Sequence, residues 1–407
     1  MKSHCSTTIT RITREKFLEV FLFEPFRTNY VWNLAVNLAL GSGGVIGEVD
    51  AVCRSLQDAA ARNDDPAQEE FVQAWSTLAE RVHGLAQADE RAGNLYTAAR
   101  KFLRASMYYM TAERHANPHD ARKPALYRKM QDCFKTGIRH RKDAVEWVEI
   151  PYQGAAMPAL FFPVPGASNA PCMIHFDGLD VMKEWIYLAG IAQELQRRGV
   201  ATLIVDHPGV GEALRLRNLP SIPEMEKPAT ASLDWLATRK EVDALRTGIM
   251  AVSLGGYYAP RAAAFEPRLK CCVAWGAQWD WHERIVTRLD PASTSQRSVP
   301  HFVDHLNWVF GQANLDDSMK IISRFKLEGI AQRIACPLLI VHGENDRQIP
   351  LAHAEALLDA AVNSPAKELK VFRQAEGGIE HCQADNGTLA IDYMADWVAR
   401  TLGGRTQ

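Results

Sequence analysis

The chain has 407 residues, more than one ordinary domain, so we expect two cores or one large core with an appendage. Hydrophobic residues make up 47% of the chain and charged residues 23%, which is the composition of a globular protein and excludes a disordered one. The net charge of −2, without a dense run of Lys or Arg, excludes a field that attracts polyanions, so we expect no nucleic-acid partner.

The first forty residues carry no pattern of a secretory or membrane segment. Residues 1–17 lack a continuous apolar run, and the apolar stretch VWNLAVNLAL at 31–40 contains two Asn and is too short to cross a bilayer. The eight cysteines are scattered without a C-x-x-C pair, which is typical of reduced, mostly buried thiols. We therefore expect a cytoplasmic protein that does not bind a membrane.

The pattern changes near residue 145. Residues 1–144 are predicted to form a helical region, since apolar residues recur at helical spacing. Residues 145–407 alternate β-rich and helical runs, which predicts an α/β fold with a doubly wound, mostly parallel sheet. Residues 277–334 break this alternation and are predicted to be an inserted helical lid. The clearest helical face, in NLYTAARKFLRASMYYMTAER at 94–114, consists of Leu95, Ala99, Phe102, Ser106, Tyr109 and Met110.

The segment GIMAVSLGG at 248–256 places Ser253 between a predicted strand and a predicted helix. This is the setting of the nucleophile elbow, G-x-S-x-G, in which a strained turn presents the serine hydroxyl. Ala251 replaces the first Gly, a departure of one methyl group, and we expect Gly256 to provide extra room. The alternative is a polar residue in a tight turn, because this pattern also arises by chance.

Two downstream residues complete the order Ser, Asp, His that the α/β-hydrolase arrangement requires. The strand in CPLLIVHGENDRQIP ends in a loop with Asp346, and the strand in KVFRQAEGGIEHCQADNG ends in a loop with His381. We expect His381 to take the proton of Ser253 and Asp346 to orient the imidazole. Glu344 competes with Asp346 for that role. Asp346 could instead be a solvated turn acid, and His381 could be a loop histidine without a catalytic role.

The oxyanion of a serine hydrolase needs backbone donors, because charge develops on the carbonyl oxygen. One is predicted at the N–H of Leu254, directly after the serine, and the other at Gly178 or Leu179 in MIHFDGLDVMKEW. Asp180 and Glu184 in the same segment either lead the following helix or lie near the substrate.

No motif predicts a cofactor or a metal. DHPGVGEA at 206–213 lacks the Lys of a P-loop and the spacing of a dinucleotide site. His301 and His305 in HFVDH lie four apart, but Phe302 replaces the zincin Glu, so we expect them to face substrate or solvent. The tryptophans at 275, 279, 281 and 308 either pack or form an aromatic-tolerant pocket, and Trp279 is our candidate substrate contact.

Several segments together resemble one branch of the α/β-hydrolase superfamily, which includes 2,6-dihydroxypseudooxynicotine hydrolase, fungal polyketide-shortening hydrolases and fermentation-respiration-switch-type proteins. These segments are GSGGVIGEVDAV, AARKFLRASMYYMTAE, VEIPYQGAAMPALFF, FDGLDVMKEW, DHPGVGEA, VSLGGYYAPRAAA, HGENDRQIP and GGIEHC. The resemblance implies that the helical region covers the active site, that Ser253, Asp346 and His381 match the family's catalytic residues, and that the protein is a homodimer.

The better-known members of that branch cleave a carbon–carbon bond beside a ketone. The resemblance thus implies a serine hydrolase that acts on an aromatic or polyketide-like small molecule. A carboxylesterase or thioesterase would use the same residues with an easier leaving group. The sequence is also compatible with a non-catalytic binding or regulatory protein of the same fold and with a peptidase of the prolyl-oligopeptidase kind.

Overall fold

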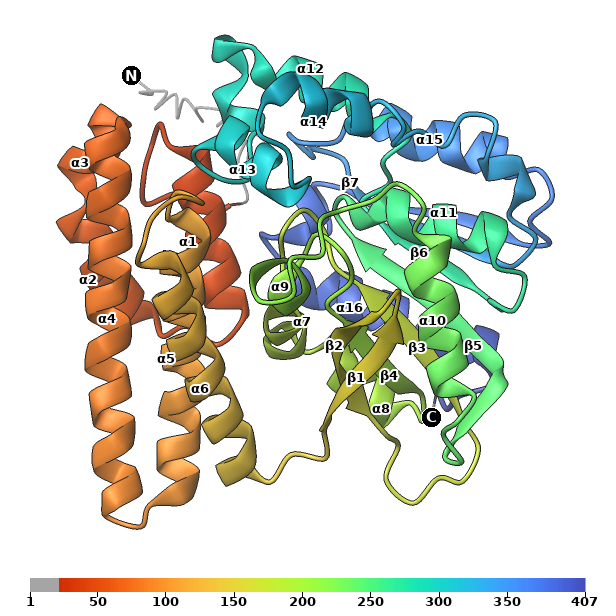
Figure 1. Ribbon diagram of the computed structural model, residues 1–407, viewed down its shortest axis with the longest axis horizontal. Coiled ribbons are helices and arrows are strands. Elements are labelled where there is room, and N and C mark those ends of the chain that lie inside the picture. Colours follow the sequence, from red (N-terminus) through yellow and green to blue (C-terminus); the bar gives the residue numbers. More distant parts are fainter. Residues whose placement is uncertain (1–21, 407) are drawn as a thin grey trace, which may run out of the picture.

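The computed structural model describes residues 22–406 and divides into a helical region and a sheet flanked by helices (Figure 1). The long helices α4, α5 and α6 pack against one another beside the sheet (Figure 1). Of the face predicted on α5, only Leu95 is exposed, because it begins the helix directly after the turn that follows α4. The helical region contains α1 (Tyr30–Gly41), α2 (Ile46–Ser55), α3 (Gln57–Arg62), α4 (Asp65–Arg91), α5 (Leu95–His115) and α6 (Lys123–Arg141).

Eight strands of the described chain form one sheet in the order β1-β2-β4-β3-β5-β6-β7-β8. Only the β1–β2 and β2–β4 pairs are antiparallel, which confirms the predicted mostly parallel sheet. The strands are β1 (Glu146–Tyr152), β2 (Ala155–Phe162), β3 (Ala170–Phe176), β4 (Ala201–Val205), β5 (Val242–Val252), β6 (Cys272–Trp275), β7 (Leu338–Gly343) and β8 (Lys367–Phe372).

The central strands are buried along their whole length because helices cover both faces of the sheet. Along β5, Ile249 and Ala251 point into the core that contains α10 and α11, whereas Met250 and Val252 point into the core that contains α8 and α16. The flanking helices are α7 (Lys183–Ala189), α8 (Ile191–Arg197), α9 (Gly211–Arg215), α10 (Glu226–Leu236), α11 (Gly255–Phe265), α15 (Leu351–Ala360) and α16 (Gly387–Leu402).

The segment between β6 and β7 is helical and forms a layer of its own at the top of Figure 1. Trp281 is buried there against Phe310 and Phe325, with ring centroids 5.7 and 5.4 Å away. This aromatic core explains the loss of strand periodicity in the sequence. The segment contains α12 (Trp281–Leu289), α13 (Phe302–Val309) and α14 (Leu315–Ile322), with short 3-10 turns at Pro291–Gln296 and Ala331–Arg333.

Between residues 22 and 406, no helix combines the length and apolarity that a membrane crossing needs. The division of the chain into two domains at residue 145 stays a prediction.

Candidate active site

Ser253 occupies the turn between β5 and α11 with a φ of 62°, a left-handed conformation that L residues rarely adopt. Its N–H donates to the carbonyl oxygen of Trp275 at 2.8 Å, which ties the turn to the end of the neighbouring strand. The strained turn and the strand-to-helix setting are those of a nucleophile elbow.

The small residues around the turn are required by close approaches of the backbone. A Cβ on Gly255 would lie 2.5 Å from the Cβ of Ala251, so Ala at 251 is compatible only with Gly at 255. A Cβ on Gly256 would lie 1.9 Å from the carbonyl oxygen of Gly276. The absence of a side chain on Gly256 therefore leaves space for the loop after β6. Our expectation that Gly256 makes room for Ala251 was wrong.

Three side chains that the sequence predicted to cooperate form one hydrogen-bonded chain. The Oγ of Ser253 lies 2.8 Å from Nε2 of His381, and Nδ1 of His381 lies 2.8 and 3.0 Å from the two carboxylate oxygens of Asp346. Asp346 also accepts the N–H groups of Gln348 and Ile349 at 2.8 and 2.9 Å, which fixes the carboxylate. All three residues follow strands whose carboxyl ends meet at one edge of the sheet.

Glu344, the competing acid, faces another way. Its carboxylate accepts the backbone N–H of Gln374 and lies 3.5 Å from Arg373, on the side of the β8 turn. The structure therefore brings Asp346, and not Glu344, to the histidine.

Burial and charge set the protonation of the His381–Asp346 pair. Burial disfavours the imidazolium, but the Asp346 carboxylate outweighs that effect and raises the pKa of His381. Burial likewise opposes the charge on Asp346, and the attraction to His381 keeps the pKa of this carboxyl below its usual range. The pair is therefore suited to holding a proton taken from Ser253 as an imidazolium beside an ionised carboxylate.

The loop that carries His381 is held by Asp385, a residue that the sequence analysis missed. The Asp385 carboxylate accepts three successive N–H groups, those of Gly378, Ile379 and Glu380, at 2.8, 3.0 and 3.0 Å. An Asp shortly after a Gly-rich loop is the signal that could have revealed it, because short acidic side chains commonly bind nearby backbone N–H groups.

The predicted oxyanion donors surround Ser253. A Cβ on Gly178 would lie 2.9 Å from the Cβ of Ser253, so the loop after β3 runs directly against the serine. Within residues 22–406, the N–H groups of Leu254, Gly178 and Leu179 have no hydrogen-bond partner. Leu254, with Gly178 or Leu179, can therefore supply donors to an oxygen beside Ser253.

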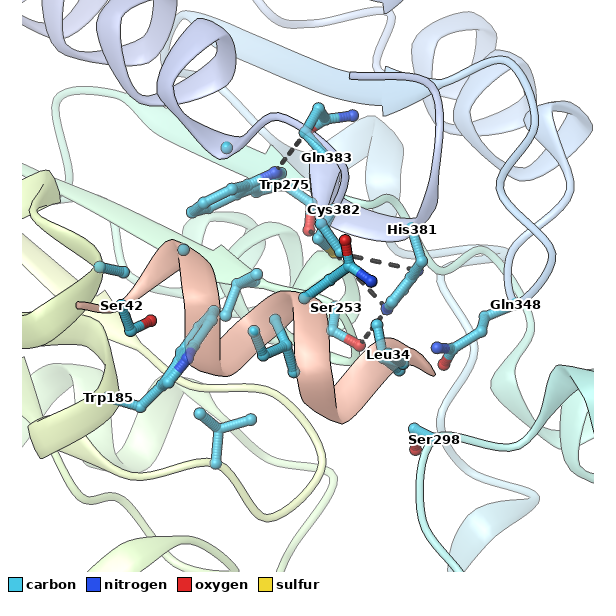
Figure 2. A pocket seen from close by; sticks show the side chains of 18 of the residues that line it. Leu34, Ser42, Trp185, Ser253, Trp275, Ser298, Gln348, His381, Cys382 and Gln383 are labelled. Carbon is cyan, nitrogen blue, oxygen red and sulfur yellow. Dashed lines mark hydrogen bonds between the residues drawn. The ribbon is translucent and has the colours of Figure 1, made fainter. Parts of the chain in front are cut away.

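Ser253 and His381 border a cavity of about 940 Å³, including its open mouth (Figure 2). Helix α1 crosses this cavity in Figure 2, with Trp185 and Trp275 on the side away from Gln348 and Ser298. Most of the lining is apolar, as is usual for a cavity that binds a small organic molecule. The lining residues from the helical region are Leu34, Asn37, Leu38, Gly41, Ser42 and Arg114.

Helix α1 is fixed by the two Asn residues of the VWNLAVNLAL stretch. Asn33 accepts the N–H of Phe26 at 3.0 Å and donates to its carbonyl oxygen at 2.7 Å. Asn37 makes the same pair of bonds with Phe23, at 3.1 and 2.7 Å. These side chains replace backbone partners for the preceding segment, so the Asn residues that argued against a membrane span have a structural role.

The residues predicted to contact substrate do not line this cavity. Asp180 and Glu184 are fully buried and ion-paired, Asp180 with Arg215 and Glu184 with Lys183. Neither caps α7, whose N-cap is Met182 without a side-chain bond. Glu184 does lie in the first turn of α7, as one interpretation predicted. The sequence did not reveal the partner of Asp180, because Arg215 lies 35 positions away.

The lid residues also lie elsewhere. His305 is buried with Nε2 3.5 Å from Asp180, and His301 borders a separate polar hollow beside Asp65. The Trp279 N–H donates to Nδ1 of His353, and its side chain packs on the core. Of the four tryptophans considered, only Trp275 lines the cavity, so the aromatic-rich lid packs mainly on itself.

Comparisons with known proteins agree with this geometry. The family described as esterase FrsA-like matches residues 68–388. The chain is 29% identical over 406 residues to hydrolase LUC6 of a Fusarium species, covering 90% of this chain and 95% of that protein. It is 27% identical over 382 residues to 20-hydroxy-prefusarin hydrolase FUS2 of Gibberella moniliformis, covering 84% and 90%.

A solved structure shares the fold. The crystal structure of 2,6-dihydroxy-pseudo-oxynicotine hydrolase superposes with a TM-score of 0.72 at 22% identity, covering 90% of this chain and 95% of that one. The predicted α/β-hydrolase fold and the predicted resemblance are confirmed, and the chain is a hydrolase. With most of its length matched, this chain belongs to the FrsA-like esterase family.

Proposed function

We propose that this protein is a serine hydrolase that uses Ser253, His381 and Asp346 to cleave a carbon–carbon bond next to a ketone in an aromatic or polyketide-like small molecule. The observation that carries the proposal is the unbroken hydrogen-bonded chain from Ser253 Oγ through His381 to Asp346 at the wall of an apolar cavity. The relative named for 20-hydroxy-prefusarin supports a substrate of this general kind.

In the proposed reaction, Oγ of Ser253 attacks a ketone carbonyl carbon while Nε2 of His381 takes the hydroxyl proton. The oxyanion accepts hydrogen bonds from the N–H of Leu254 and of Gly178 or Leu179. The carbon–carbon bond then breaks, and its electron pair leaves as a carbanion stabilised by the second carbonyl group. The His381 imidazolium returns its proton to this carbanion.

A water molecule completes the cycle. His381 removes a proton from the water, which attacks the acyl group on Ser253, and the serine leaves with the proton that His381 returns. The net reaction adds one water across the broken bond, giving a carboxylic acid and a ketone. Asp346 remains ionised throughout and orients the imidazole.

An ester or thioester substrate is the second candidate, supported by the description of the family as esterase-like. The same residues would act in the same order, and only the leaving group would differ. The raised pKa of His381 favours neither candidate, because both need the imidazolium as proton donor.

Product analysis separates the two candidates. We would incubate the protein with an aryl 1,3-diketone and with an aryl ester, and identify the products by mass. Cleavage of the diketone to an acid and a ketone, abolished in Ser253→Ala, is the expected result. Ser298→Ala is the matched control, because Ser298 lines the same cavity without contacting His381. Ester cleavage with an intact diketone would favour the esterase.

A further inference from the structure

Arg114 places a positive charge at the wall of the cavity that holds Ser253. It lies in the last turn of α5, and among the described residues lining this cavity it is the only Arg, Lys, Asp or Glu. The rest of the lining is mainly apolar and includes Leu34, Leu38 and Trp275. A permanent charge in such surroundings is costly unless something pairs with it.

Within the part of the chain that the structure describes, Arg114 makes one hydrogen bond. Its Nε donates to the backbone carbonyl oxygen of Asp180 at 3.1 Å. Over residues 22–406, its two terminal nitrogens have no hydrogen-bond partner, and no carboxylate oxygen lies within 4.0 Å of the guanidinium. The guanidinium therefore keeps donors free beside the cavity.

The charged carboxylates that act most strongly on Arg114 are bound to other cations. Arg215 binds Glu113 at 2.7 and 2.8 Å and also binds Asp180 through both oxygens. Lys123 lies 3.2 Å from the same Glu113 carboxylate. These partners leave Arg114 without a carboxylate of its own.

Neighbouring ionisable groups do not replace that partner. Burial raises the pKa of Asp177 well above its ordinary value, which weakens this carboxyl as a charged partner for Arg114. Burial also lowers the pKa of Arg114, which measures how poorly its charge is solvated. An arginine nevertheless stays protonated in a protein, so the unpaired charge persists.

We propose that Arg114 determines specificity by binding a delocalised oxyanion of the substrate, either a carboxylate or the enolate of a 1,3-diketone. Both groups present two oxygens in one plane, which match the planar fork of a guanidinium. The inference rests on the proposed function, because it takes this cavity as the place where substrate is hydrolysed. It narrows the substrate to molecules that carry such a group within reach of Arg114.

The test measures binding to the full-length Ser253→Ala protein by calorimetry, so that no turnover is needed. The probes are phenylacetate, phenylbutyrate and phenylhexanoate, each with its primary amide, and benzoylacetone with its analogue dimethylated between the two carbonyls, which cannot form the delocalised enolate. We expect at least one oxyanion-forming probe to bind about tenfold or more tightly than its neutral counterpart. Tighter binding of an acid than of its amide indicates a bound carboxylate, and tighter binding of benzoylacetone than of its dimethylated analogue indicates a bound enolate.

Variants assign the preference to Arg114. Arg114→Gln should remove it, and Arg114→Lys should retain part of it, since the charge stays while the Nε bond to Asp180 is lost. Arg104→Gln on the same helix, which removes the partner of Glu48 outside the cavity, should leave the preference unchanged. Equal or absent binding of charged and neutral probes, or a preference that survives Arg114→Gln, would overturn the proposal.

Labelling of the wild-type protein with a fluorophosphonate separates this inference from the proposed function. Labelling of Ser253 without any oxyanion preference would overturn the role of Arg114 alone. An oxyanion preference in Ser253→Ala together with an unlabelled wild type would overturn the proposed function and leave the binding site standing.

Discussion

The carboxyl edge of the sheet and the helical region contribute different kinds of residues to one cavity. The sheet edge contributes Ser253, His381 and Asp346, whose side chains are joined by hydrogen bonds and whose loops are held by backbone hydrogen bonds. The helical region contributes the apolar face of α1 and the unpaired Arg114. Under the proposed function, bond-breaking and recognition lie on separate elements, so changes in the helices should alter substrate choice before they alter chemistry.

The contact between the two regions combines apolar packing with buried ion pairs. The sheet is packed by apolar clusters on both faces, whereas α5 and α9 meet through buried ions centred on Arg215. Arg215 joins Glu113 of α5 to Asp180 of the loop after β3, and the next ion pair, Lys183 with Asp206, lies 2.6 Å apart. Such pairs tolerate little sliding, so we expect the helical region to be held in one position over the cavity.

The largest effect on activity is expected at the sheet edge. Asp346→Asn should lower kcat/KM for an aryl ester about 10⁴-fold, because the imidazole loses the partner that fixes its tautomer. Circular dichroism should show an unchanged fold. Glu344→Gln, the matched control, should keep activity near that of the wild type, and an equal loss there would contradict the assignment of the acid.

The pH profile gives a second measure of the same pair. Because the Asp346 carboxylate raises the pKa of His381 and the imidazole must be neutral to accept the serine proton, kcat/KM should rise with pH. The acid limb should have its midpoint above the ordinary histidine pKa of about 6.5. Asp346→Asn should move this midpoint to lower pH, and a shift in the opposite direction would refute the account.

Breaking the ion pairs between the two regions should lower the free energy of unfolding. Arg215→Met leaves Glu113 and Asp180 as buried carboxylates without their main partner, so the free energy of unfolding should fall by about 3–5 kcal/mol. Chemical denaturation measures this change. Arg54→Met, which breaks an exposed pair with Asp50, should cost less than about 1 kcal/mol. Comparable losses in the two variants would show that the buried ions do not join the regions.

Removing a residue that positions His381 should lower activity less than removing a residue that takes part in the reaction. Asp385→Ala removes the acceptor of three N–H groups in the histidine loop, so kcat should fall about ten- to hundredfold as the imidazole loses its alignment. The rate of fluorophosphonate labelling should fall in parallel with kcat while KM changes little. Asp392→Ala, on the exposed face of α16, should behave as the wild type.

The smallest effect is expected in the helical region. Leu38→Phe on α1 narrows the cavity, so KM for a bulky aryl ester should rise a few-fold while an acetyl ester is unaffected. Leu40→Phe, on the same helix but outside the lining, is its control. A fall in kcat for both esters would mean that α1 also shapes the reacting geometry, against the separation of chemistry from recognition.

The sequence predicted the parts of the molecule that local pattern determines. Ser253 and Asp346 each follow a strand that ends in a buried apolar run, and His381 follows the last strand, KELKVF, in a fixed order. Arg114 could not be found in this way, because it contacts a residue 66 positions away and its lack of a partner is a property of the packed structure. The ion pair of Asp180 was missed for the same reason, since Arg215 comes from α9.

The central claim is that Ser253, activated by His381, is the nucleophile of this hydrolase. The most direct test is the intact mass of the folded protein after exposure to a fluorophosphonate, beside Ser253→Ala and Ser298→Ala. The account predicts a single adduct in the wild type and in Ser298→Ala, and none in Ser253→Ala. An unlabelled wild-type protein, or an adduct that persists in Ser253→Ala, would contradict it.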